Sequence, residues 1–115
     1  MESILTSIKQ MLGIEETYTQ FDQEIIININ SVFINLLQIG VGPVAGFSIS
    51  DKTNTWQEFL STSPNLEAVK LYMYYKVRLG FDPPATSFVL EAMKSQAQEI
   101  EWRLNVLVEG GAPSE

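Results

Sequence analysis

The chain contains no cysteine and no histidine among its 115 residues. Without cysteine it can form no disulfide, present no thiolate nucleophile and build no Cys-based metal site. Without histidine it lacks the commonest general base and the commonest metal ligand. Its serine hydroxyls therefore have no imidazole to activate them. These two absences exclude Ser-His hydrolases, thiol enzymes and the usual zinc sites.

Basic residues and long apolar runs are scarce as well. Seven Lys and Arg stand against fourteen Asp and Glu, for a net charge of −7. The bases are scattered singly, whereas a specific nucleic-acid binder gathers them on one face. No apolar run approaches the roughly 20 residues that span a membrane, and the N-terminus lacks the basic region of a signal peptide. We therefore expect neither duplex-gripping nor a membrane partner.

No catalytic constellation is visible in the sequence. Glu15 with Glu16 and Glu99 with Glu101 are the close acidic pairs. Residues one or two apart on a helix point in different directions, so neither pair builds a carboxylate dyad unaided. Residues 40–43 (GVGP) read as a helix stop and turn, not as a phosphate-binding loop. We expect no enzyme active site, no cofactor and no metal.

Helical periodicity is the main positive signal. The length and a hydrophobic content of 45% fit one globular domain at 1–108, followed by a flexible tail at 109–115. Apolar residues recur at helical spacing in several segments, which predicts an all-α small helical bundle. The predicted helices span residues 4–12, 21–39, 55–60, 65–80 and 86–108. The core-facing stripe of the last helix comprises Val89, Leu90, Met93, Ala97, Ile100, Leu104, Leu107 and Val108.

Sequence signals for helix starts support three of these segments. Ser3 is suited to cap the first helix. Thr55 and Glu58 have the spacing of a capping box, in which each side chain accepts from the other residue's backbone N–H. Ser63 before Pro64 fits the start of the fourth helix, because proline is tolerated in a first turn.

Two segments leave alternatives. Between residues 25 and 30 isoleucines alternate with other side chains, and β-branched residues favour strands. The helical period nevertheless persists to residue 39, far beyond the length of a usual strand, which favours a helix. Residues 41–54 are rich in Gly and Pro and have no helical period. They are predicted to form a loop or a small β-hairpin, with a short strand at 47–49.

The break Phe81-Asp82-Pro83-Pro84 separates the last two helical segments. Proline has no N–H to donate and steers the preceding residue away from helical geometry. We therefore predict a long helical pair hinged at Asp82, Pro83 and Pro84. The Asp82 side chain is expected to fix the corner by accepting backbone hydrogen bonds, as Asp does in turns.

The helix at 65–80 is apolar on two sides. A helix of this kind is either central in its domain or shared with a neighbouring subunit. Tyr and Trp are favoured at protein interfaces, where one end of the ring can stay wet. We expect the second face of this helix to pack on another chain. The predicted subunit interface comprises Leu71, Tyr72, Tyr75, Leu79 and Trp102.

Seven short stretches, in this order, carry a more specific signal. They are residues 4–13 (ILTSIKQMLG), 21–22 with 29–33, 37–42, 65–70, 77–84 (VRLGFDPP), 87–90 and 99–105 (EIEWRLN). Each alone is common, but together they cover nearly the whole chain. The combination resembles the small head–tail connector proteins of tailed bacteriophages, which are portal adaptor or head completion proteins.

The resemblance implies a mainly helical subunit that assembles as a homo-oligomeric ring, a dodecamer of about twelve copies. Such a ring lies between the portal protein and tail-side stopper or tail terminator proteins in the virion neck, after assembly in the bacterial host cytoplasm. DNA would pass through its lumen without sequence-specific binding. An acidic wall suits this role because it repels DNA. We further expect Val106, Leu107 and Val108 to contact the portal.

Two other classes of function fit parts of the sequence. A small intracellular interaction module, such as a regulator or an antitoxin-like binder, would form a small discrete oligomer. A Mg²⁺-dependent enzyme that uses carboxylates alone would need several acids converging on one pocket, whereas the helical wheels scatter them. Particle mass separates these alternatives, because only the connector forms a large ring.

Overall fold

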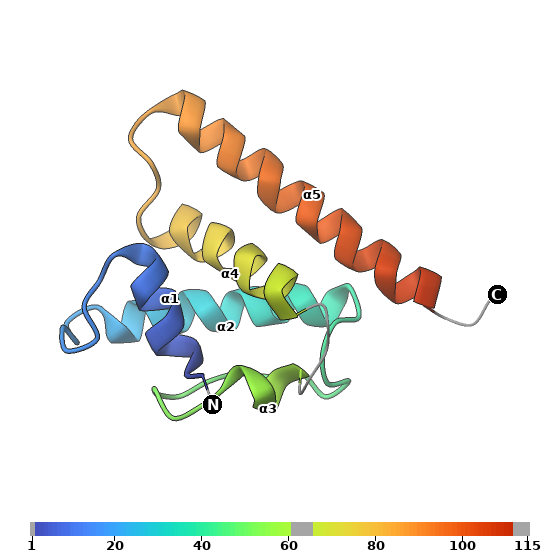
Figure 1. Ribbon diagram of the computed structural model, residues 1–115, viewed down its shortest axis with the longest axis horizontal. Helices are drawn as coiled ribbons and strands as arrows, with labels where there is room; N and C mark the ends of the chain where they lie inside the picture. The colour runs from blue at the N-terminus through green and yellow to red at the C-terminus, as the bar shows by residue number, and fades with distance from the viewer. Residues whose placement is uncertain (1, 61–65, 112–115) are drawn as a thin grey trace.

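The computed structural model describes residues 2–60 and 66–111, with side chains up to residue 106. This described part forms five helices and contains no β-strand, so the all-α prediction is confirmed (Figure 1). An isolated antiparallel bridge joins Ser3 and Thr55. The helices are α1 (Ile4–Leu12), α2 (Asp22–Gln38), α3 (Trp56–Leu60), α4 (Leu66–Phe81) and α5 (Ser87–Gly111).

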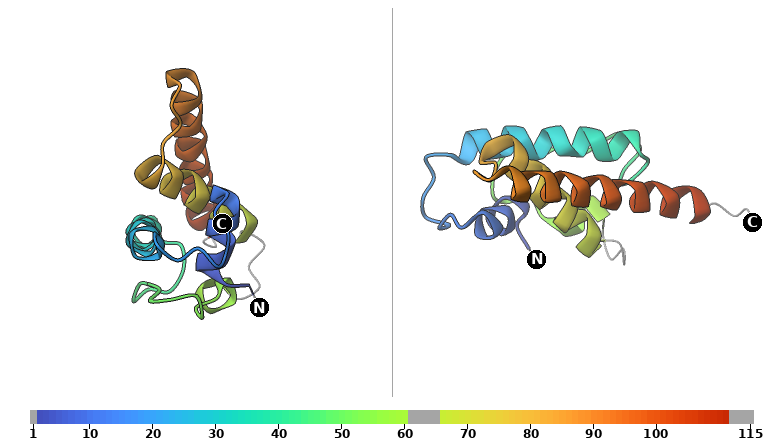
Figure 2. Two further views of the ribbon diagram at one scale, coloured as in Figure 1. Left: turned by 90° about the vertical axis from the view of Figure 1, so that its left-hand side faces the viewer. Right: turned by 90° about the horizontal axis from the view of Figure 1, so that it is seen from above.

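The molecule is flat, with extents of 47 × 35 × 19 Å. Helix α4 is central, because it packs against α2, α5 and α1. Figure 2 shows α2 on one side of the thin dimension and α1 on the other. The core contacts of α4 come from Val69, Met73 and Val77, which are fully buried.

Helix α1 begins and ends where local chemistry predicts. The Ser3 Oγ accepts a hydrogen bond from the Thr6 backbone N–H, as an N-cap does. Gly13 adopts the left-handed conformation (φ 81°) that ends a helix at little cost to glycine. One face of α1 is buried, and the Trp56 indole of α3 donates to the Ser7 Oγ at 2.8 Å. This bond ties α3 to α1.

Helix α2 confirms the helical interpretation of the isoleucine-rich segment over the strand. Ile25, Ile29 and Leu36 are fully buried and lie on one side of the helix. Their spacing of four and seven residues matches a helix and not the two-residue period of a strand.

Segment 41–54 forms a loop, and in the described residues it contains no hairpin. The Asn30 side-chain amide of α2 does the work of a strand partner instead. Its Nδ2 donates to the Ile49 carbonyl at 3.0 Å, and its Oδ1 accepts from the Ile49 N–H at 2.8 Å. The rings of Phe33, Phe47 and Phe59 pack together beside it, with centroids 4.7–5.4 Å apart.

The predicted capping box at the start of α3 is present. The Glu58 carboxylate accepts from the Thr55 backbone N–H at 3.1 Å, and the Thr55 hydroxyl accepts from the Glu58 N–H at 3.3 Å. The predicted cap at Ser63 and Pro64 lies outside the described residues.

Helix α5 differs from its prediction at the end and along its stripe. It continues to Gly111, so residues 109–111 of the expected tail are helical. Of the predicted core-facing stripe only Ala97, Ile100 and Leu104 are buried, and Val89 is exposed. The cause is length: α5 has 25 residues and α4 only 16, so α5 extends beyond its support (Figure 1).

The corner between α4 and α5 is held differently from the prediction. The Asp82 side chain makes no hydrogen bond within the described chain. Instead the Arg78 guanidinium donates through Nε to the Asp82 carbonyl oxygen at 2.6 Å, while the Asp82 N–H donates to the Arg78 carbonyl. The corner is therefore closed from the last turn of α4.

Candidate interaction surfaces

The described side chains do not gather for catalysis. No group of three acidic residues in this part of the chain could hold a metal ion. Glu99 pairs with Arg103, whose Nη2 lies 2.7 Å from Glu99 Oε2, whereas Glu101 accepts a bond from another helix. None of the helices described is long and apolar enough to cross a bilayer. The features that stand out are exposed apolar surfaces.

Tyr72 belongs to the core and not to an exposed interface. It is fully buried, and its hydroxyl donates to Glu101 Oε1 of α5 at 3.0 Å. Burial, together with the bond to the Glu101 carboxylate and its charge, raises the pKa of the Tyr72 phenol well above its usual range. Because α5 covers this part of α4 within the same chain, we leave Tyr72 out of the interface.

The other four predicted interface residues divide into two groups. Tyr75 and Leu79 are half-buried on α4. Leu71 is 39% exposed and Trp102 is 66% exposed. The second apolar face of α4 is thus partly satisfied within the chain, and Leu71 and Trp102 remain available to a neighbour.

The outer face of α5 is apolar along most of its length. Phe88 is 84% exposed, and Trp102 and Val106 project from the same face because their spacings of fourteen and four residues are near whole turns. These three side chains lie off the core-facing stripe of α5. Val106 is exposed as a portal-contact residue should be, whereas the side chains of Leu107 and Val108 lie outside the description.

Helix α2 carries an exposed apolar pair that the predicted interface did not include. Ile27 is 66% exposed and Ile34 is 58% exposed, on the side opposite the buried isoleucines. The signal was present in the sequence, since these two residues are seven apart and fall outside the core stripe. It was missed because the wheel was searched for a core face and not for a second one.

A groove of about 430 Å³ separates α1 from α4. Its apolar wall comes from Leu71 and from Met11, which is 40% exposed. At its edge the Lys70 ammonium pairs with Glu2 and, at 3.5 Å, with Glu67. Partial burial acts to lower the pKa of Lys70, but the bonds to these carboxylates and their charges outweigh it and raise the pKa.

The chain has no match among curated proteins or solved structures. A family model described as phage connector protein matches residues 4–111, a stretch that runs from the first residue of α1 to the last residue of α5. The match thus includes the central helix α4, the corner and the exposed face of α5. The chain therefore belongs to the phage connector protein family.

Proposed function

We propose that this protein is a structural, non-enzymatic connector subunit of the virion neck. Copies of it form a closed ring between the portal and the tail-side stopper or tail terminator proteins. The ring is assembled in the bacterial host cytoplasm and contains about twelve copies, since closed cyclic symmetry uses one repeated contact between neighbours. Membership of the phage connector family supports this proposal.

The observation that carries the proposal is the apolar outer face of α5. A protein that acted alone would have little reason to expose Phe88, Trp102 and Val106 on one helix, because contiguous exposed apolar patches mark interaction sites. Trp is also among the residues most enriched where binding energy concentrates. Trp102 and Leu71, with the half-buried Tyr75 and Leu79, are the proposed sites of contact with a neighbouring copy.

The charge of the chain fits a DNA conduit. At a net charge of −7, a ring of copies presents DNA with a strongly acidic particle. Like charges repel, so DNA passing through the lumen would not adhere to the wall. No sequence-specific reading of DNA is needed for this role.

Particle mass tests the proposal. The purified chain, alone and mixed with its portal, is examined by native mass spectrometry and electron microscopy. We expect a ring of about twelve copies on the portal. A small discrete oligomer that ignores the portal would contradict the proposal and favour a regulatory interaction module.

A deletion tests the proposed portal contact. Removal of residues 106–115 takes away the exposed Val106 and the end of α5. We expect the truncated chain to stay folded, because Leu104 is the last described buried residue of α5, and to lose portal docking. Substituting Val44, an exposed residue of the 41–54 loop, with Asp provides the control. Docking that survives the deletion would contradict this contact.

A further inference from the structure

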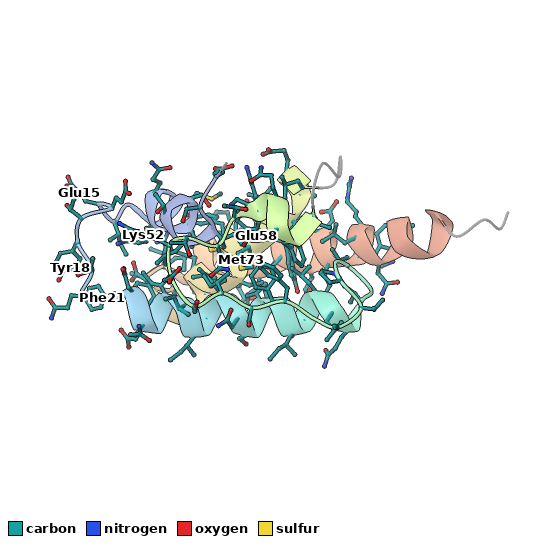
Figure 3. All side chains as sticks on the ribbon, turned by 90° about the horizontal axis from the view of Figure 1, so that it is seen from below. Glu15, Tyr18, Phe21, Lys52, Glu58 and Met73 are labelled. Atoms are coloured by element: carbon teal, nitrogen blue, oxygen red, sulfur yellow. The ribbon has the colours of Figure 1, made fainter. Side chains whose placement is uncertain are left out.

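The outer face of α2 is a flat apolar surface without a partner in the described chain. We define it by Glu24, Ile27 and Ile34. The two isoleucines are seven residues apart, so they lie on the same side of the helix about 10 Å from each other. Figure 3 shows side chains of α2 projecting away from the rest of the molecule, whereas Met73 lies in the packed interior. Exposure of two isoleucines here is not needed for folding.

A second apolar surface lies between α1 and α4. We define this α1–α4 face by Met11, Leu71 and Arg78. The buried residues Val69, Met73 and Val77 point from α4 toward the core, and Leu71 lies roughly opposite them on the helix. The groove beside Leu71 provides a concave surface of the kind that accepts the side of a helix.

The two surfaces face away from each other across the thin dimension of the molecule. This dimension is 19 Å, with α2 on one side and α1 on the other (Figure 2). A ring requires two different surfaces on each copy that are complementary to one another, because its contacts are heterologous. A flat subunit with apolar patches on its two broad sides meets that geometric requirement.

The charges on the two surfaces are complementary. Helix α2 contains no Lys or Arg and carries Asp22 and Glu24, whereas α4 carries two more bases than Asp or Glu side chains. Asp22 already pairs with Lys9. In the part of the chain that is described, no ion pair is formed by Glu24 or by Arg78. Each is therefore available to an opposite charge on another copy.

We infer that the α2 outer face of one copy docks on the α1–α4 face of the next, with Ile27 and Ile34 against Met11 and Leu71. This inference rests on the proposed ring and names the surfaces that build it. The occupant of each face is a second copy of this chain, because the opposite face of the same molecule supplies the apolar area and the opposite charge.

A mixing experiment tests the polarity of this contact. Ile34→Asp disables the α2 outer face, and Leu71→Asp disables the α1–α4 face. Each variant alone should lose ring formation on the portal, with subunit association weakened at least about tenfold. Mixed together, they should form a discrete one-to-one pair, since each supplies the face that the other lacks. Val44→Asp, at a position 98% exposed outside both faces, should assemble as wild type does.

Each other outcome has a definite meaning. Self-pairing of Leu71→Asp would show that α2 faces meet symmetrically and would overturn the inference. Rings formed by both variants would overturn it too, while leaving the connector role intact. Failure of the wild-type chain to form rings would instead count against the proposed function. Circular dichroism checks that each variant is folded, which is expected because both positions are exposed.

Disulfide trapping gives an independent readout, because the chain contains no cysteine. A chain with both Ile34→Cys and Leu71→Cys should give a ladder of covalent oligomers on oxidation. Each single substitution should give no covalent dimer. A dimer from either single variant would indicate a symmetric contact and contradict the inference.

Discussion

At the scale of single residues, a buried lysine organises the first connection of the chain. The Lys9 ammonium donates to the Glu16 carbonyl at 3.0 Å and the Tyr18 carbonyl at 2.7 Å, and it lies 2.8 Å from the Asp22 carboxylate. All three of its protons thus have oxygen partners, which offsets much of the cost of burying the charge. No periodicity marks this role, because it depends on where the 13–21 loop returns to α1.

Gly42 shows how a single hydrogen atom can be required. Its φ is +95°, and a Cβ placed there would lie 2.4 Å from Phe59 Cε1. We expect Gly42→Ala to lower the free energy of unfolding by about 2–4 kcal/mol, from backbone strain together with overpacking. Urea unfolding measures the loss.

Gly13→Ala is the matched control for Gly42→Ala. Gly13 has a similar φ of +81°, but a Cβ there would meet nothing within 4 Å. Its cost should be the backbone strain alone, about 1–2 kcal/mol. Equal losses in the two variants would mean that the aromatic cluster yields freely around position 42.

Tyr72 should make stability sensitive to alkaline pH. Its phenol has a raised pKa in the folded protein, so the stability it contributes is complete below about pH 10 and is lost as pH rises further. The loss attributable to Tyr72 should be about 1.4 kcal/mol per pH unit. Urea unfolding of wild type between pH 8 and 11.5 measures this slope.

Tyr72→Phe should reduce that slope by the same amount, because the ionising group is gone. Tyr18→Phe replaces an exposed tyrosine and is the matched control. If wild type and Tyr72→Phe lost stability in parallel above pH 10, the assignment of the effect to Tyr72 would be wrong.

At the scale of elements, the corner at 82–86 positions α5 on α4. Pro83 is exposed and Pro84 is half-buried, and neither belongs to the core. Replacing both with Ala removes the block to helix continuation at this point. We expect the unfolding free energy to change by less than about 1 kcal/mol, while ring formation on the portal falls sharply because the helices no longer meet at one angle.

Electron microscopy and urea unfolding of the double variant together test this expectation. Pro43→Ala, in the 41–54 loop, is the control for loss of a proline elsewhere. Normal rings from the double variant would show that the prolines do not set the geometry of assembly.

Element types were predictable because each helix carries several signals that agree. The period of α2 outweighed its strand-forming isoleucines, and Ser3, Thr55 and Glu58 marked the starts of α1 and α3. The function of Asn30 was not predictable. Its amide pairs with the Ile49 backbone nineteen residues away, and the sequence contains no rule for a contact of that range.

At the scale of the whole molecule, exposure was harder to predict than structure. The sequence gives apolar positions on both faces of α4 but not which neighbour covers each. Tyr72 was assigned to a subunit contact, whereas α5 covers it within the chain. Ile27 and Ile34 escaped notice because their exposure becomes visible only once α2 has a defined inner side. Which surfaces are left for partners thus depends on how all five described helices pack.

Helix α5 is a lever whose fulcrum is its buried middle. Its 25 residues span about 37 Å, and its described burial is confined to Ala97, Ile100 and Leu104. A tilt of about 10° around Ile100 would move Phe88, twelve residues away, by about 3 Å. Small changes in seating at the fulcrum are therefore amplified at the tip, while the packing of α1, α2 and α4 is left unchanged. A subunit built in this way can meet partners of slightly different radius without rebuilding its core.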